Sequence, residues 1–324
     1  MDMKSISDYS SLIETAIAGS IYSSLKPASL YEPIAYGLQK GGKRLRPVIL
    51  LITAEAFGTP APQAMPQALG IEMFHNFTLL HDDVMDRSSL RRGRPTVCAK
   101  WDDNTAILSG DTMLTLATRL ISQTPDQRLR SVLDIFNTMA IEVYEGQRLD
   151  MDFEERENVS VSEYIEMIGK KTGALLGASA RIGAVIAGAP ETDAALMYDF
   201  GMELGLAFQI QDDLLDTFGD PATFGKPIGG DILNNKKTFL TTSLMEKCDA
   251  DAGALADAMK MPASELKIRV VKGIYEKAGI PAECRKDIAA HSKKALKALR
   301  STSLPEADRR LLEHLVEKLI DRSR

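Results

Sequence analysis

The pattern of hydrophobic and polar positions along the chain is typical of helices. Stretches such as SVLDIFNTMAIEVYEG place apolar residues at helical spacing, and alternating β-branched runs bounded by turn signals are nearly absent. The 14 prolines leave windows long enough for helices, and one window, residues 126–189, contains no proline. We therefore predict an all-α fold of about ten or more helices joined by short loops.

No long Ser- or Gly-rich linker divides the chain. Its 324 residues would permit two domains, but an uninterrupted helical pattern favours one. With 44% hydrophobic and 26% charged residues, the composition is that of a globular protein with a sizeable core, which excludes disordered and collagen-like classes. We predict a single domain over residues 1–324.

The net charge excludes one class of partner. At −6, the chain lacks the basic surplus that a nucleic-acid-binding protein needs. The charge is uneven, because residues 267–324 hold 15 Lys and Arg against 8 Asp and Glu, or +7. This basic region is either a solvated helix face or a weak attraction to anionic membrane.

Compartment and membrane signals are few. The N-terminus has no basic segment followed by an apolar run, so we expect no secretory signal, and no apolar stretch is long enough to predict a transmembrane helix. The three cysteines, Cys98, Cys248 and Cys284, are too widely spaced for a disulfide framework or a zinc knuckle. These features favour a reducing compartment and a cytoplasmic location.

Two acidic motifs carry most of the chemical information. LLHDDVMD ends at Asp86 and QIQDDLLD ends at Asp216, and each contains DDxxD. One such match is weak evidence, but two are stronger. On a helix, residues four apart lie on nearly the same face. The six acidic candidates are Asp82, Asp83, Asp86, Asp212, Asp213 and Asp216.

The ligand type predicts the metal. A pair of acids on a helix is often only a solvated face, but here each cluster follows an apolar run, where carboxylates are costly unless cations neutralise them. Carboxylate oxygens suit Mg²⁺, or Mn²⁺, and Mg²⁺ usually shares its shell with water and substrate phosphate. The sequence therefore predicts a phosphate ester bound through Mg²⁺.

Basic residues occur near both motifs. GGKRLRP places Lys43 and Arg46 three apart, on one face if this is a first helical turn, and His75 shares a helix face with Asp82. Alone, each could be an ordinary surface or core residue. Two sets of cations beside two sets of aspartates suggest two phosphate-bearing substrates. The remaining candidates are Arg91, Arg92, Lys171, Thr172, Lys226 and Lys236.

Together these motifs resemble the trans-isoprenyl diphosphate synthase (polyprenyl synthetase) family. GGKRLRP, HDDVMD, RRGRPT, GQRLD, KKTG, FQIQDD and GKPIGGDILNNKK occur in that family's order, over roughly residues 30–245. The resemblance implies a helical bundle around a central cavity, usually a homodimer. It also implies Mg²⁺-dependent head-to-tail condensation of isopentenyl diphosphate with dimethylallyl, geranyl or farnesyl diphosphate.

The resemblance also implies roles for individual residues. Asp82, Asp86 and Asp212 are similar to the metal ligands that hold the allylic diphosphate, and Asp83, Asp213 and Asp216 complete the motifs. The expected cationic clamp on that diphosphate is Arg91, Lys171, Lys226 and Lys236, and the expected isopentenyl diphosphate site is Lys43, Arg46, His75 and Arg92. Thr172, Gln209, Gln147 and Asp150 resemble polar groups that steady the carbocation.

Phe77 and Thr78 bear on product length, because they precede Asp82 by about one helical turn. A single aromatic residue at the fifth position before DDxxD resembles enzymes that make geranylgeranyl diphosphate, which is the product we expect. Farnesyl diphosphate and longer products are alternatives, and Phe77 could instead be ordinary core packing.

Three other functional classes were weighed. A terpene cyclase resembles the first motif but carries a different second metal motif, and a non-catalytic subunit of a heteromeric synthase would have lost one acidic or basic set. A helical scaffold with acidic surface clusters leaves the ordered basic residues unexplained. The sequence favours the synthase.

Overall fold

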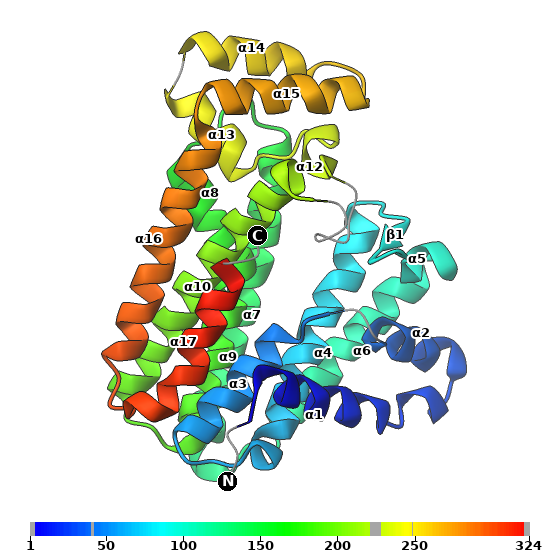
Figure 1. Cartoon of the computed structure of the whole chain (residues 1–324). Coiled ribbons are helices and arrows are strands. Elements are labelled where there is room, and N and C mark those ends of the chain that lie inside the picture. Colours follow the sequence, from blue (N-terminus) through cyan, green and yellow to red (C-terminus); the bar gives the residue numbers. More distant parts are fainter. Residues whose placement is uncertain (1–3, 40–41, 221–227, 248, 321–324) are drawn as a thin grey trace. The chain divides into compact units, whose positions relative to one another are not determined.

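The computed structural model describes residues 4–39, 42–220, 228–247 and 249–320 of the chain. Helices dominate this described part, and its two strands form one short antiparallel hairpin (Figure 1). The predicted all-α fold is confirmed, as is the large number of helices.

The elements follow one another with short connections. In chain order they are α1 (Ile6–Ala18), η1 (Tyr22–Ser24), α2 (Ala28–Leu38), α3 (Leu45–Ala56), α4 (Ala61–Met85), β1 (Leu90–Arg91), β2 (Arg94–Pro95), α5 (Val97–Lys100), α6 (Asp103–Ile121), α7 (Asp126–Glu154), α8 (Val161–Ile168), η2 (Gly169–Gly173), α9 (Ala174–Ala187), α10 (Glu191–Phe218), α12 (Gly230–Leu233), α13 (Phe239–Lys247), α14 (Asp249–Met259), α15 (Glu265–Lys277), α16 (Ile280–Arg300) and α17 (Glu306–Ile320).

The chain divides into two compact units. Unit 1 comprises Met1–Asn137, Ser179–Ala195 and Ser303–Leu312. Unit 2 comprises Thr138–Ala178, Leu196–Thr302 and Glu313–Arg324. That the whole of residues 1–324 acts as one domain stays a prediction.

Helix α4 lies at the core of unit 1, where it packs against α3 and α6. Its middle residues are buried on several sides, as expected of a helix that is apolar nearly all round. Gly70 permits the close approach of α6, because a Cβ there would lie 2.9 Å from the Ile121 side chain and 3.1 Å from the Ala117 carbonyl oxygen. This packing fixes α4, whose last turn carries the first DDxxD motif.

Unit 2 has its own hydrophobic core, built from α7, α8, α10 and α12 to α16. The buried side chains include large aromatic and aliphatic residues on facing helices, among them Phe153, Tyr164, Ile210, Phe239 and Tyr275. This core holds the second DDxxD motif at the end of α10.

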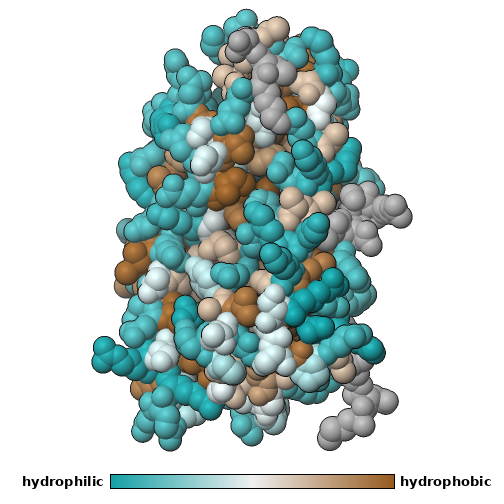
Figure 2. Space-filling model, turned by 90° about the vertical axis from the view of Figure 1, so that its left-hand side faces the viewer, coloured by the Kyte–Doolittle hydropathy of each residue, from teal (hydrophilic) through white to brown (hydrophobic). Residues whose placement is uncertain are grey.

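Part of the basic C-terminal region lies on the surface of α16. Every exposed charged residue of this helix is basic, namely Arg285, Lys286, Lys293, Lys294, Lys297 and Arg300. Figure 2 looks onto the side on which α16 lies in Figure 1, and hydrophilic side chains prevail there. None of the helices in the described part of the chain combines the length and the apolar character needed to cross a membrane.

Candidate active site

The last turn of α4 carries Asp82 and Asp83, and Asp86 is the C-cap of the helix. Asp82 and Asp86 therefore lie one turn apart, as predicted. The partial negative charge of a helix dipole lies at this end, and the last turn of α4 contains no basic residue to oppose it. A cation bound by Asp82 and Asp86 would relieve this unfavourable arrangement.

Asp83 differs from its two neighbours, because its side chain is buried. It accepts a hydrogen bond from Arg91 Nε at 2.7 Å. Burial raises the pKa of Asp83, while the charge of Arg91 opposes that shift. Asp83 thus joins the acidic helix end to the basic hairpin that follows.

The RRGRPT segment lies in the hairpin β1–β2. Leu90 pairs with Pro95 and Arg91 with Arg94, which leaves Arg92 and Gly93 as a two-residue turn. Both turn residues have positive φ, 53° and 73°, as the tight turns favoured in hairpins require. A glycine meets this requirement without strain, and the turn places Arg92 at the tip.

The predicted isopentenyl diphosphate residues Arg46, His75 and Arg92 belong to one basic cluster. Arg46 Nη1 lies 3.2 Å from His75 Nε2, and the buried Nε of Arg46 has no hydrogen-bond partner among the described residues. A Cβ on Gly42 would lie 3.1 Å from the Arg92 guanidinium nitrogens, so this glycine leaves room for Arg92. The cluster brings together two motifs that are distant in the sequence.

Electrostatics in this cluster favour an anion. Burial lowers the pKa of Arg46 to about 10, and burial together with the positive charges of Arg46 and Arg92 lowers the pKa of His75 well below its usual value. His75 is therefore neutral at physiological pH. A diphosphate would offset the repulsion among the arginines and provide an acceptor for the unpaired Nε of Arg46.

The prediction that Lys43 and Arg46 share a helical face is wrong. Helix α3 begins at Leu45, and Arg44 before it adopts a left-handed conformation with φ of 48°. Lys43 is exposed and lies outside the helix, so the direction of the chain changes between the two residues.

A pocket open to solvent lies beside the hairpin within unit 1. Its lining includes Gln39, Asn76, Leu80, Arg91, Arg92 and Thr96. Asp83 also lines it, so acidic and basic groups meet at its wall. The pocket has room and polar partners for a charged ligand.

The two residues predicted to set product length lie on α4. Phe77 is buried, with its ring packed edge-on against Phe74 and His81 at centroid distances of 5.5 and 4.8 Å. Thr78 is half-buried, and its hydroxyl donates to the His75 carbonyl at 2.8 Å. Phe77 is thus part of an aromatic cluster less than two turns from Asp82.

The second motif repeats the geometry of the first in unit 2. Asp212, Asp213 and Asp216 lie in the last two turns of α10, whose last turn also lacks a basic residue. Asp212 is half-buried and Asp213 is buried, as Asp82 and Asp83 are. Each motif therefore has a first aspartate near the surface and a second one turned inward.

Asp213 is held by three donors. Its carboxylate accepts from the Tyr164 hydroxyl, from Phe239 N at 3.0 Å and from Gln209 Nε2 at 3.1 Å. Burial raises the pKa of Asp213 to about 7, although these hydrogen bonds oppose the shift. We therefore assign Asp213 a positioning role.

Asp216 contacts the first turn of α12. Its Oδ2 accepts from the Asp231 amide at 3.0 Å, in the first turn of α12. Beyond this helix, Asn235 has φ of 54° and accepts at 2.7 Å from Nζ of Lys267, a buried lysine that also donates to the Met259 carbonyl. These contacts hold the loop that carries Lys236.

Lys171 and Thr172 lie in a π-helical turn, η2, between α8 and α9. Such turns are rare and often occur at functional sites. A Cβ on Gly146 of α7 would lie 2.8 Å from Lys171 Cα, so the GQRLD motif supplies the glycine that lets α7 approach this turn. Thr172 Oγ1 donates to Gln209 Oε1 at 3.1 Å.

Lys171 and Lys236 both lie near Asp150, whereas their predicted role in a clamp on diphosphate stays a prediction. Lys171 Nζ lies 2.6 Å from Asp150 Oδ2, and Lys236 Nζ lies 4.0 Å from the same oxygen while it pairs with Glu154. Gln147 lies in α7 between Gly146 and Asp150 and is half-buried. Lys226 lies outside the described residues.

The structure adds two residues that sequence reasoning missed, Tyr164 and Arg44. Both act through long-range contacts, Tyr164 on Asp213 and Arg44 on Glu14 and Glu72. Their neighbours in the sequence give no such signal. Among the described residues, no group of three or more His, Cys, Asp or Glu side chains is arranged as a preformed metal site.

Comparison with known proteins identifies the family. The polyprenyl synthetase family model matches residues 27–278. The chain belongs to the polyprenyl synthetase family. This polyprenyl synthetase is 41% identical over 250 residues to geranylgeranyl diphosphate synthase of Sulfolobus acidocaldarius, covering 76% of this chain and 74% of the relative. It is 36% identical over 320 residues to geranylfarnesyl diphosphate synthase of Natronomonas pharaonis, covering 92% and 91%.

Solved structures agree with the assignment. A crystal structure of a geranylgeranyl pyrophosphate synthase matches with a TM-score of 0.94 and 41% identity, covering 99% of this chain and all of that one. Geranylgeranyl pyrophosphate synthase from Corynebacterium glutamicum, complexed with isoprenyl diphosphate and magnesium, matches with a TM-score of 0.84 and 26% identity over 98% and 97% of the two chains. This polyprenyl synthetase is therefore a prenyltransferase.

Proposed function

We propose that this prenyltransferase condenses isopentenyl diphosphate with an allylic diphosphate, head to tail, and makes chiefly geranylgeranyl diphosphate. The observation that carries the proposal is the repeated acidic helix end, on α4 and on α10, without a basic residue in either last turn. A bound cation stabilises a helix C-terminus that carries carboxylates, and Mg²⁺ binds to carboxylates together with substrate phosphate.

The donor set fits Mg²⁺, because it consists of carboxylate oxygens. Asp82, Asp86 and Asp212 are the proposed ligands, since Asp83 and Asp213 are bound to protein donors. When bound, the metal neutralises the leaving diphosphate. Mn²⁺ offers the same chemistry.

Lysine and arginine side chains are proposed to neutralise the same leaving diphosphate. As the allylic C–O bond breaks, diphosphate gains negative charge, and Arg91, Lys171, Lys236 and Lys226 are proposed to bind it. Lys171 and Lys236 then exchange their present carboxylate partners, Asp150 and Glu154, for the substrate. This exchange makes binding of the diphosphate part of assembling the clamp.

The basic cluster holds the second substrate. Arg46, Arg92 and Lys43, with neutral His75, bind the diphosphate of isopentenyl diphosphate, which needs no metal because the protein supplies the positive charge. The isopentenyl double bond then attacks the allylic carbocation, a C–C bond forms, and one proton leaves. The released diphosphate is the proposed base.

Thr172 and Gln209 are proposed to steady the carbocation. Their side chains are joined by a hydrogen bond, and Gln209 is held by Asp213, so the oxygens are fixed before substrate binds. Gln147 and Asp150 of α7 are proposed to assist. Fixed dipoles stabilise developing charge better than mobile ones.

The test is direct. Purified protein with Mg²⁺, isopentenyl diphosphate and each of dimethylallyl, geranyl and farnesyl diphosphate should yield geranylgeranyl diphosphate, identified by mass spectrometry. Asp82→Asn and Asp212→Asn should each reduce turnover strongly, whereas Asp134→Asn, which alters an exposed carboxylate paired only with Arg130, should not. No diphosphate release from any substrate pair would refute the proposal.

Product length has its own test. Phe77→Ala opens space within the aromatic cluster and should lengthen the product, because the growing chain is proposed to end against this ring. Phe77→Leu removes less volume and should lengthen it less. An unchanged product would place the limit elsewhere, and farnesyl diphosphate from the wild type would favour the shorter alternative.

A homodimer and a cytoplasmic location are also proposed. Ile107 and Leu108 expose 43% and 59% of their surface on α6, which supports an apolar contact with a second copy. Light scattering on the purified protein and fractionation of the producing cells test the two statements.

A further inference from the structure

Arg44 lies between two residues of the proposed isopentenyl diphosphate site, Lys43 and Arg46, but is not part of that site. It is 3% exposed, which is rare for an arginine, and its backbone is left-handed. A buried arginine in a strained backbone conformation needs compensating contacts.

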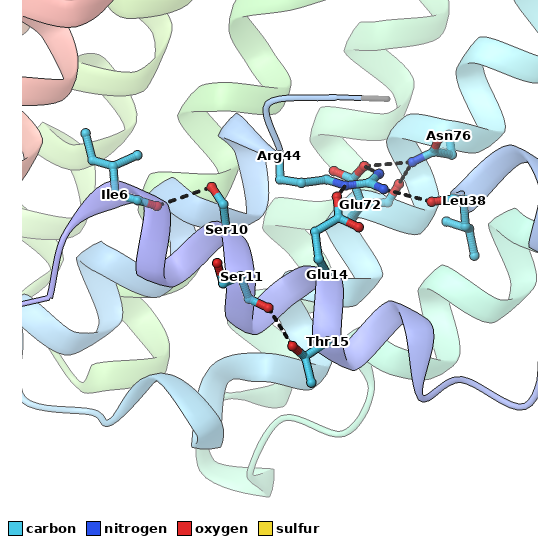
Figure 3. A network of polar contacts seen from close by, with 9 residues as sticks. All are labelled: Ile6, Ser10, Ser11, Glu14, Thr15, Leu38, Arg44, Glu72 and Asn76. Carbon is cyan, nitrogen blue, oxygen red and sulfur yellow. Dashed lines mark hydrogen bonds and ion pairs between the residues drawn. The ribbon is translucent and has the colours of Figure 1, made fainter. Parts of the chain in front are cut away.

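Three acceptors provide those contacts (Figure 3). Arg44 Nε donates to Glu14 Oε1 at 2.8 Å, Nη1 to Glu72 Oε1 at 2.5 Å and Nη2 to the Leu38 carbonyl at 2.8 Å. These acceptors come from α1, α4 and the end of α2. Arg44 therefore ties three helices to the start of α3.

Of the three acceptors, Glu72 is the one closest in sequence to the proposed isopentenyl diphosphate site. It precedes His75 by one turn of α4, and His75 contacts Arg46. The same oxygen of Glu72 accepts from Asn76 Nδ2 at 2.9 Å, and Asn76 lines the pocket with Arg91 and Arg92. The charge of Glu72 raises the pKa of Arg46 and of Arg92, against the effect of burial, so it reaches both cations.

A carboxylate one helical turn from His75, the partner of Arg46, would compete with a diphosphate for the donors of this cluster once it is released from Arg44. Arg44 and Asn76 occupy one oxygen of Glu72, and within the part of the chain that the structure describes the buried Nε of Arg46 has no partner. The basic cluster thus keeps a donor for substrate although a buried carboxylate lies beside it.

We propose that Arg44 is a positioning residue that holds Glu72 away from Arg46 and Arg92 and so keeps these cations open to isopentenyl diphosphate. The inference rests on the proposed function, because it assumes that this cluster binds that substrate. It differs from a purely structural role in one respect, since the loss of Arg44 should weaken the binding of isopentenyl diphosphate and leave that of the allylic diphosphate nearly unchanged.

The experiment compares four variants with the wild type. Arg44→Gln should raise the KM for isopentenyl diphosphate about 10- to 100-fold, the range expected when a charged donor pairs internally, and leave the KM for the allylic diphosphate nearly unchanged. Glu72→Gln added to Arg44→Gln should restore the KM to within about threefold of the wild type. Glu72→Gln alone should change little, and Arg130→Gln, at an exposed i,i+4 pair, is the control.

Rescue confined to the KM for isopentenyl diphosphate is the decisive result. Neutralising an unpaired buried carboxylate would also relieve a purely structural defect, but the melting temperature and the KM for the allylic diphosphate would then recover with it. A double variant as weak as Arg44→Gln, or weaker, overturns the inference. If Arg44→Gln does not fold, Arg44→Lys with and without Glu72→Gln gives the same comparison. The KM for isopentenyl diphosphate should then rise less in the single variant.

Calorimetric binding of isopentenyl diphosphate to the same proteins separates the two proposals. If the wild type does not turn over but the variants bind isopentenyl diphosphate in the expected order of affinity, the proposed function is refuted and the role of Arg44 stands. If the wild type turns over but all variants bind isopentenyl diphosphate with equal affinity, only the role of Arg44 is overturned.

Discussion

Tyr164→Phe tests how far the second acidic motif depends on a residue outside it. The hydroxyl of Tyr164 donates to Asp213, which is buried near the end of α10 and whose other donors among the described residues are Phe239 N and Gln209 Nε2. The substitution removes one donor and keeps the ring, so packing in the core of unit 2 is preserved.

The expected size follows from the charge on the acceptor, which Asp213 carries when the pH lies above its pKa of about 7. A hydrogen bond to a charged group contributes about 1.5–3 kcal/mol to the free energy of unfolding. Unfolding entropy of about 2.1 cal/mol/K per residue over a chain of this length is about 0.7 kcal/mol/K, so the melting temperature should fall by about 2 to 4 °C. Turnover should fall by about 2- to 10-fold, because Gln209 and Asp212 lose a fixed neighbour.

Circular dichroism melting and steady-state kinetics measure the two effects. Tyr198→Phe is the control, since it removes a hydroxyl that donates to half-buried Glu142 at 3.1 Å and should shift the melting temperature less. A Tyr164→Phe protein that melts with the control, with wild-type turnover, would refute the positioning role of Tyr164.

Three further predictions follow from contacts in the site. Gly146→Ala places a Cβ against the backbone of Lys171 and should lower the free energy of unfolding by about 1–3 kcal/mol and abolish most of the turnover, as denaturant unfolding and a product assay would show. Gly273→Ala, with open space around it, should be tolerated. Lys267→Met removes the donor that holds Asn235, so kcat should fall while the melting temperature changes little. A fall in both quantities would instead indicate general damage to the fold. Mg²⁺ with diphosphate should raise the melting temperature by roughly 4 °C at one hundred times its Kd, and EDTA should abolish the rise, whereas no shift would argue against metal binding at the acidic helix ends.

The fold class and the placement of the paired aspartates follow from local sequence signals. Helical spacing in residues 126–189 and the i,i+4 placement of Asp82 and Asp86 are properties of short segments, and the structure agrees with both. The helix windows also predicted that His75 and Asp82 share one helix.

The division of roles within each motif could not be predicted in this way. Asp83 and Asp213 look like their neighbours in the sequence, and only packing turns them inward toward Arg91 and Tyr164. The π-helical turn at Lys171 depends on the distant Gly146, and the left-handed Arg44 depends on carboxylates of two other helices. Each of these features arises from contacts between segments far apart in the chain.

The acidic ends of α4 and α10 have a consequence for the lifetime of the protein. Both helices end with carboxylates that oppose their own dipoles, so the substrate-free form carries an unfavourable term that bound cations remove. Ligands that bind only the folded state protect it from local opening and proteolysis. The abundance of this protein in a cell should then rise and fall with the supply of its metal and diphosphate, and turnover of the polypeptide becomes coupled to turnover of the substrate.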